Sequence, residues 1–183
     1  RGAAAGFRSM FSPRCTLAGE IWLTLATWNR ESGMPEADER TLRFRRNLDS
    51  KLKAPRWPEG VRVRTLLPGD TPAIYNLLAA IDPGDAGTGG SLETWWQRLV
   101  NDTEFDPALC FLAVDWHDRL VGVAQCWTSA FIKDLAVLPE ARGRGIGESL
   151  LWHVFDVFRS RGARHVDLKV VAENATAQRL YER

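Results

Sequence analysis

The chain has 183 residues, 45% of them hydrophobic, which is enough for one domain of about 100–150 residues plus an extension. Lys plus Arg number 24 and Asp plus Glu 23, a near balance without an electrostatic footprint for nucleic acid or a membrane surface, and no apolar run approaches the ~18 residues of a membrane span. Cys15, Cys110 and Cys126 show no metal-ligand spacing, so we expect no metal site and a reducing cytoplasm.

The proline-rich stretch at residues 54–60 divides the chain in two. Each proline disfavours helix in the residue before it, so this stretch predicts an extended linker. Residues 1–53 form an N-terminal extension in which Ile21–Thr27 and Thr41–Leu48 could be strands. Residues 61–183 carry clearer patterns and predict a domain.

The first half of this domain predicts three strands and two helices. Apolar residues that alternate with polar ones or run together indicate strands, and apolar residues three and four apart indicate helices. Asp70 or Thr71, and later Ser91, have side chains that can cap a helix. In chain order, the segments are a strand at Val61–Leu66, a helix reaching Ile81, a helix reaching Val100, and strands at Leu109–Val114 and Leu120–Trp127. The last two strands, joined by a short turn, predict an antiparallel hairpin.

The second half predicts two strands and two helices. Six apolar residues between Ile146 and Phe158 recur at spacings of three and four, which gives one helix a wide apolar stripe. This helix lies between strands at Phe131–Leu138 and His165–Val171, and Asn174–Tyr181 forms a short final helix. The order β-α-α-β-β-β-α-β-α predicts an α/β (α+β) domain with a mixed sheet that is not doubly wound.

Glycines at alternate positions occupy the segment Gly143–Gly147, between a strand and the amphipathic helix. Glycine lets successive backbone N–H groups converge on one point, and it has no β-carbon to block a phosphate. The helix N-terminus adds unpaired N–H groups and a positive dipole end, and Arg142 and Arg144 add positive charge. The segment therefore predicts an anion cradle, for which a diphosphate is the natural guest.

Three other interpretations compete for this loop. A mononucleotide-binding P-loop needs a Gly-Lys-Ser/Thr ending, which Gly147-Glu148-Ser149 does not supply. A dinucleotide site needs G-x-G-x-x-G directly after the first strand of a βαβ unit. Here the glycines run G-x-G-x-G and a hairpin precedes them, although Asp167 lies about where a ribose-binding acid could be. A plain glycine turn with surface arginines is the third interpretation.

The six residues Arg142–Gly147 match the R/Q-x-x-G-x-G/A signature of the GNAT superfamily of N-acetyltransferases. Residues 135–137 with Pro139 resemble the strand that precedes this signature, and residues 174–183 are similar to the N-x-x-A-x-x-L-Y-E element of the same superfamily. The resemblance covers residues 61–183. It implies a GNAT-like fold, with a mixed, mostly antiparallel sheet flanked by helices.

The resemblance also implies acetyl-CoA as co-substrate, no metal, and a role for each matching position. The backbone of the strand would pair with the amides of the pantetheine arm, and the N–H groups of the loop would hold the pyrophosphate. Asn174 would contact the cofactor, and Tyr181 would be the general acid near the thioester sulfur. The strand residues are Leu135, Ala136 and Val137, and the loop residues are Arg142, Gly143, Arg144, Gly145, Ile146 and Gly147. Alternatively, Asn174 could cap its helix and Tyr181 could be a core aromatic residue.

Acyl transfer to an amine requires a base that takes one proton. Asp134 is the candidate base or substrate-amine anchor, although Lys133 beside it could lower its pKa, and it could also be a solvated charge. Glu104 and Asp106 are weaker candidates. We expect N-acetyl transfer from acetyl-CoA to a primary amine of a small molecule or peptide. The alternative is a non-catalytic acyl-CoA-binding module, the degenerate half of a tandem acetyltransferase.

Members of the superfamily continue past the Tyr-Glu-Arg element with Gly-Phe and two further strands, so residues 61–183 predict a C-terminally incomplete domain. Parts of residues 31–48 resemble that tail. We therefore expect residues 1–53 to be the remnant of a preceding acetyltransferase repeat, with Ile21–Thr27 as its penultimate strand. A second possibility is that this segment supplies strands to the sheet of the following domain. Helix or unpaired coil at residues 18–48 would contradict the first of these, the remnant hypothesis.

Overall fold

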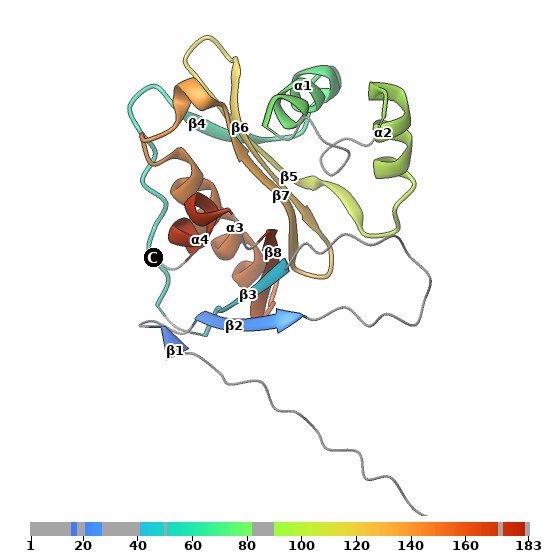
Figure 1. Cartoon of the computed structure of the whole chain (residues 1–183). Coiled ribbons are helices and arrows are strands. Elements are labelled where there is room, and N and C mark those ends of the chain that lie inside the picture. Colours follow the sequence, from blue (N-terminus) through green and yellow to red (C-terminus); the bar gives the residue numbers. More distant parts are fainter. Residues whose placement is uncertain are drawn as a thin grey trace, which may run out of the picture.

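The computed structural model describes residues 16–17, 21–26, 41–49, 51–81, 90–171 and 174–181. The strands among these residues form one sheet, in the order β1-β2-β3-β8-β7-β6-β5-β4 (Figure 1). All neighbouring strands are antiparallel except β7 and β8, which are parallel. The strands are β1 (Thr16–Leu17), β2 (Ile21–Ala26), β3 (Thr41–Asn47), β4 (Arg62–Thr65), β5 (Phe105–Val114), β6 (Leu120–Trp127), β7 (Phe131–Val137) and β8 (His165–Val171).

Helices cover both faces of the sheet (Figure 1). α1 (Thr71–Ile81) and α2 (Leu92–Val100) lie on one face, and α3 (Ile146–Ser160) and α4 (Ala175–Tyr181) lie on the other. The predicted order of elements and the mixed, mostly antiparallel sheet flanked by helices are confirmed. None of the helices in the described ranges is long and apolar enough to cross a membrane.

Each face of the sheet carries its own layer of buried side chains. Because successive residues of a strand point to opposite faces, Phe111 of β5 packs in the α3 layer and Leu112 in the α1–α2 layer. The predicted stripe of α3 provides one side of its layer. The α3 residues buried there include Ile146, Leu150, Leu151, Val154, Phe155 and Phe158.

Two boundaries differ from the sequence prediction. β5 begins at Phe105 rather than Leu109, because Phe105 pairs with Trp127 across a register shift that precedes Cys110. A single 3₁₀ turn, η2 (Pro139–Ala141), follows β7, where a loop was expected. Proline suits its first position, which needs no backbone N–H.

Strands from the N-terminal segment complete the sheet beside β8. β3 pairs with β8 along its whole length, from Thr41 opposite Val171 to Asn47 opposite His165, and β2 pairs with β3. The expectation of strands near 21–27 and 41–48 is confirmed, and they extend the sheet of the following domain. That they derive from a preceding repeat stays a prediction.

A buried carboxylate holds the seam between β3 and β8. Asp167 of β8 accepts hydrogen bonds from Arg43 and from Arg45, whose Nε lies 2.7 Å from Asp167 Oδ1. The Asp167 side chain is only 6% exposed. The Asp167 carboxylate is therefore bound by two arginines and is not free to bind a ribose. This removes the support for a dinucleotide site.

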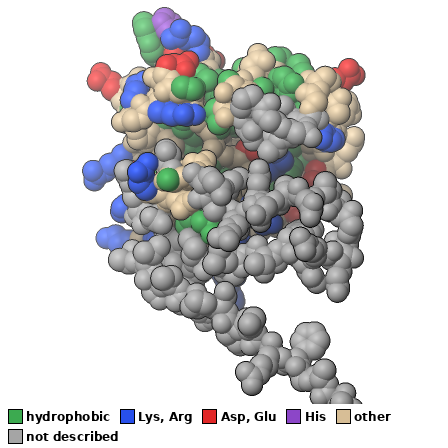
Figure 2. Space-filling view, viewed as in Figure 1, with side chains coloured by type: hydrophobic (Ala, Val, Ile, Leu, Met, Phe, Trp, Pro, Cys, Tyr) green, Lys and Arg blue, Asp and Glu red, His purple; other side chains and the backbone are tan. Residues whose placement is uncertain are grey.

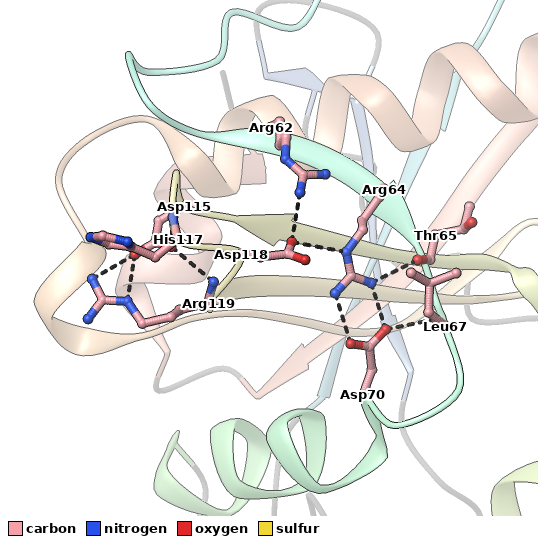
Figure 3. A network of polar contacts seen from close by, with 9 residues as sticks. All are labelled: Arg62, Arg64, Thr65, Leu67, Asp70, Asp115, His117, Asp118 and Arg119. Carbon is pink, nitrogen blue, oxygen red and sulfur yellow. Dashed lines mark hydrogen bonds and ion pairs between the residues drawn. The ribbon is translucent and has the colours of Figure 1, made fainter.

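A polar network fixes the outer edge of the sheet (Figure 3). Arg64 of β4 forms a two-pronged ion pair with Asp70, at 2.6 and 2.8 Å, which ties the edge strand to the start of α1. Arg62 donates to Asp118 at 2.8 Å, and Asp115 accepts the backbone N–H of Arg119 in the turn between β5 and β6. These side chains stabilise an edge strand and a turn, and their charges are satisfied by one another.

Candidate functional site

The sheet splits between β7 and β8. In the described residues these strands pair only at Phe131 and Ile132 of β7, whereas β7 continues to pair with β6 as far as Val137. From Lys133 onward, the edge of β7 that faces β8 therefore has no strand partner. Such an edge carries N–H and C=O groups with which an extended ligand can pair. It includes the predicted backbone-binding residues Leu135, Ala136 and Val137.

A β-bulge lies where the split begins. Gln125 of β6 is opposite Asp134 of β7. The next residue of β6, Cys126, is opposite Ile132, so Lys133 is an extra residue in β7. A bulge bends its strand and increases the local twist, which accounts for the separation of β7 from β8 directly after Ile132.

The glycine loop opens toward free space at two positions. Gly143 has φ +74° and Gly145 φ +87°, backbone conformations that L side chains rarely adopt, and a β-carbon at either would meet no atom within 4 Å. Gly145 is the N-cap of α3, and the first helical hydrogen bond runs from Ser149 N–H to the Gly145 carbonyl at 2.9 Å. The amides of the first turn therefore have no helical acceptor, and the positive end of the helix dipole lies at an uncrowded loop. A phosphate fits this place.

Two exposed arginines flank the loop. Arg142 Nε donates to the carbonyl of Val137 at 3.0 Å, at the end of β7. Arg144 Nη2 donates to the carbonyl of Glu59 at 3.4 Å. Both contacts are to backbone carbonyls, so they leave the positive charge of each guanidinium uncompensated beside the helix N-terminus.

Close packing holds the loop against the rest of the site. A β-carbon on Gly147 would lie 3.4 Å from Leu180 Cδ2 of α4 and 3.6 Å from Val137 Cγ2 of β7. The side chain of Ile146 is buried in the α3 layer, so only its backbone can contribute to an anion site. The six predicted loop residues, Arg142, Gly143, Arg144, Gly145, Ile146 and Gly147, thus lie together, between the end of the free β7 edge and α4.

The linker runs beside α3 and brings further positive charge. Ser149 Oγ of α3 donates to the carbonyl of Arg56 at 2.6 Å, and the ring of Trp57 lies 6.3 Å from that of His153. Figure 2 shows Lys and Arg side chains along the edge of the molecule where Figure 1 traces the linker. The exposed cation of the linker is Arg56, and two further exposed cations, Lys51 and Lys53, directly precede the linker in the chain.

Helix α4 carries the two predicted residues of the C-terminal motif. Tyr181 is 9% exposed, its ring packs 5.4 Å from that of Phe44, and burial raises its pKa to about 12. The hydroxyl is therefore protonated near neutral pH, and burial makes it a weaker acid than an exposed tyrosine. Asn174 Oδ1 accepts the N–H of Ala177 at 3.0 Å, so this side chain caps α4, as its simpler interpretation predicted.

Asp134 lies on the other face of the sheet from Tyr181. Its neighbour Leu135 packs in the α3 layer, which also contains Tyr181, whereas Asp134 is opposite Gln125 in the row facing α1 and α2. Lys133 Nζ donates to Asp134 Oδ2 at 2.7 Å, and the Asp134 side chain is 17% exposed. The candidate acid and the candidate base thus approach the split of the sheet from opposite sides.

Each of the two weaker candidates makes a contact within the protein. Glu104 Oε2 accepts the N–H of Ser129 at 3.2 Å, and Asp106 pairs with Arg161 at 3.1 Å. Within the described ranges, no group of three His, Cys, Asp or Glu side chains could hold a metal ion.

The sequence reasoning missed one polar residue, Gln125. It is 1% exposed and lies directly beside Asp134. The sequence contained a signal for it: a glutamine inside the apolar run of a predicted strand places a polar amide where burial is costly unless the amide is hydrogen-bonded.

Comparison with known proteins matches residues 71–183 to the Acetyltransferase (GNAT) family. A mycothiol acetyltransferase from Thermobispora bispora is 37% identical over 151 residues, covering 76% of this chain and 51% of that protein. A streptothricin acetyltransferase from Streptomyces lavendulae is 34% identical over 122 residues, covering 64% of this chain and 58% of that protein. The crystal structure of a GCN5-related N-acetyltransferase from Sphaerobacter thermophilus aligns with a TM-score of 0.67 at 35% identity, covering 78% of this chain and 46% of that one. The chain spans about half the length of the curated relatives it matches first.

Proposed function

Because this chain belongs to the Acetyltransferase (GNAT) family, which uses acetyl-CoA as co-substrate, we propose that it transfers the acetyl group of acetyl-CoA to a primary amine. The observation that carries this proposal is the free edge of β7. It starts at the bulge at Lys133 and ends at Val137, beside the glycine loop. One extended ligand with an anionic end can use both features.

The residues present fit acetyl-CoA. The amides of Gly143–Gly147 and the charges of Arg142 and Arg144 would hold its pyrophosphate. The free backbone groups of residues 135–137 would pair with the amides of the pantetheine arm. The thioester would then lie toward the bulge, near Asp134. Asn174 caps α4 and is exposed at the surface, where its side chain would also contact the cofactor.

The chemistry assigned to the side chains is direct transfer. The lone pair of a neutral amine attacks the thioester carbonyl carbon, the C–S bond breaks, the thiolate takes a proton from the Tyr181 hydroxyl, and the amine proton passes to the Asp134 carboxylate. Much of the rate would come from fixing the amine against the thioester. A cysteine intermediate is disfavoured, since burial raises the pKa of Cys110 to about 12 and that of Cys126 well above its usual value.

The acceptor proposed is a small molecule rather than a protein terminus. Two relatives of 37% and 34% identity are named for mycothiol and streptothricin, which supports a small amine. A peptide amine is the other acceptor to be tested. Free, buried thiols at Cys110 and Cys126 are compatible with a reducing compartment, and we place the activity in the cytoplasm.

A non-catalytic acyl-CoA-binding module is the second candidate function. It is favoured by the contact of Lys133 with Asp134, because an oxygen of that carboxylate already accepts from the ammonium group of the same chain rather than from a substrate amine. We further propose that residues 1–53 are the remnant of a preceding repeat, that 54–60 are a linker, and that 61–183 are the acetyltransferase domain. The resemblance of parts of residues 31–48 to a GNAT tail supports this division.

Calorimetric titration of acetyl-CoA, free CoA and NAD tests the proposal. We expect saturable binding of acetyl-CoA and CoA, no binding of NAD, and loss of binding in Gly145→Glu, whose carboxylate would enter the anion cradle. An acceptor-amine screen then distinguishes the two functions. Turnover that Tyr181→Phe removes while binding is kept indicates the enzyme, and binding without any turnover indicates the module. Failure of the folded protein to bind acetyl-CoA would remove both.

A further inference from the structure

Gln125 is a buried amide without a hydrogen-bond partner. It lies in the middle of β6, its side chain is 1% exposed, and neither Nε2 nor Oε1 has a partner among the described residues. Nearly all buried polar groups in proteins are hydrogen-bonded, because water no longer satisfies them. An amide left unpaired in a central strand therefore points to a group that is absent from the free protein.

Gln125 stands in the middle of a row across three strands. Cys110 of β5 is opposite Gln125 on one side, and Asp134 of β7 is opposite on the other. Cys110 packs in the layer beneath α1 and α2, so this row faces the same layer. Neither of the other two members bonds the amide: a thiol is a weak partner, and Lys133, not Gln125, donates to the Asp134 carboxylate.

A second unpaired polar atom lies in this layer. Trp95 Nε1 of α2 is buried without an acceptor, and the Trp95 ring is 4% exposed. The layer thus holds an indole N–H and a carboxamide, all unpaired, in otherwise apolar surroundings. Other members of this layer are Leu112, Val123 and Ala136. An apolar residue in place of Gln125 would pack there without the free-energy cost of burying an unbonded amide.

We infer that Gln125 is a specificity-determining residue that binds a neutral polar group of the acceptor, a hydroxyl or an amide, next to its reactive amine. The inference rests on the proposed function. Asp134 would anchor the amine, and neighbouring strands are about 4.8 Å apart, so the two groups must be close together in the acceptor. A carboxamide offers both a donor and an acceptor, which suits a hydroxyl or amide better than a second charge. The chemical class is therefore a vicinal amino alcohol or an α-amino amide.

In this proposal the acceptor would approach Gln125 past Asp134. That carboxylate borders the split between β7 and β8 and is partly exposed, whereas the other sides of Gln125 are strand neighbours and the layer of α1 and α2. An acceptor whose amine reaches the split would place a neighbouring hydroxyl or amide toward β6. A simple alkylamine of the same shape would leave the Gln125 amide unpaired, and a site built to hydrogen-bond a substrate discriminates against such analogues.

The test compares 2-aminocyclohexanol with cyclohexylamine as acceptors, using acetyl-CoA and the wild-type and Gln125→Met proteins. Methionine has a similar length and no amide. We expect wild type to prefer the amino alcohol in kcat/KM by about tenfold or more, and Gln125→Met to reduce this preference to about twofold or less. The dissociation constant for acetyl-CoA should be unchanged. Because the variant loses an unpaired buried amide, its melting temperature should equal or exceed that of wild type.

A purely structural role for Gln125 gives the opposite pattern. Gln125→Met would then melt at a lower temperature and lose kcat/KM equally for both acceptors, and that outcome overturns the inference. Gln125→Leu serves as a second variant if the methionine protein does not fold. Acetylation by wild type without a preference between the two acceptors overturns this inference alone. Absence of turnover with every amine tested contradicts the proposed function itself.

Discussion

The ring of Phe44 lies 5.4 Å from the ring of Tyr181, with an angle of 57° between their planes. Phe44 belongs to β3 and is 2% exposed, so a strand from the N-terminal segment forms part of the surroundings of the proposed proton donor. The same strand pairs with β8, which forms one side of the split. Strand β3 therefore lines the candidate site as well as extending the sheet.

Truncating Phe44 should reduce both stability and turnover. Phe44→Ala removes a buried ring and should lower the free energy of unfolding by about 3–5 kcal/mol, measured by urea denaturation. A loss of this size is a large part of the ~5–15 kcal/mol of unfolding free energy of a typical domain, and Phe44→Ala could unfold the protein. The more conservative Phe44→Leu is therefore the variant for kinetics. We expect Phe44→Leu to lower kcat while the dissociation constant for acetyl-CoA is kept, because the loop of residues 142–147 is untouched. Unchanged kcat would show that Phe44 does not position Tyr181.

Removing the Tyr181 hydroxyl should affect turnover and spare binding. Tyr181→Phe keeps the ring and its packing on Phe44 and deletes the proton donor. Loss of one general acid costs about 10²–10⁴-fold in rate, and this is the expected fall in kcat. Acetyl-CoA affinity by calorimetry should stay within about twofold of wild type, since in the proposed complex the glycine loop would supply most of the anion contacts. A variant with wild-type kcat would assign the acid to another group.

The ionisation of Tyr181 should link stability to alkaline pH. Burial raises its pKa from 10.0 to about 12, so the unfolded chain releases this proton at a lower pH than the folded protein does. The stability contributed by the neutral, buried hydroxyl is thus complete below pH 10 and is lost as the pH rises through about 12. Denaturant unfolding of wild type and Tyr181→Phe at about pH 9 and pH 11.5 measures this effect. From about pH 9 to about pH 11.5, the unfolding free energy of wild type should fall by more than that of Tyr181→Phe. If the difference between the two proteins is the same at both pH values, burial does not raise the pKa of Tyr181.

Local patterns were sufficient to predict the elements and the glycine loop before α3. The alternation of β8, the apolar stripe of α3 and the glycines from Gly143 to Gly147 each depend on residues close together in the chain. The bulge at Lys133 and the position of β3 beside β8 do not. Both depend on which strands pair, and in which register, between residues far apart in the sequence. Backbone atoms of residues 135–137 form the free edge, and their side chains carry no mark of it.

Gln125 illustrates the same limit in a side chain. The sequence places a glutamine in an apolar strand, but only the structure shows that the amide is buried and that its neighbours in the row leave it unpaired. Asp167 shows the converse. Its position suited a ribose-binding acid, and its ion pairs with Arg43 and Arg45 became visible only when β3 was placed beside β8.

Two glycines at opposite ends of α3 allow the effect of a substitution on acetyl-CoA binding to be distinguished from its effect on backbone strain. Gly145, at the start, has φ +87°, and Gly162, just past the end, has φ +83°; a β-carbon at either would meet no atom within 4 Å. Alanine should therefore cost each position about 1–2 kcal/mol of unfolding free energy through backbone strain alone. Only Gly145→Ala should also weaken acetyl-CoA binding, by about tenfold or more in calorimetry, because its methyl group would project into the anion cradle and its backbone would turn the N–H groups away. Equal affinities in Gly145→Ala and Gly162→Ala would mean that the loop before α3 does not bind the pyrophosphate.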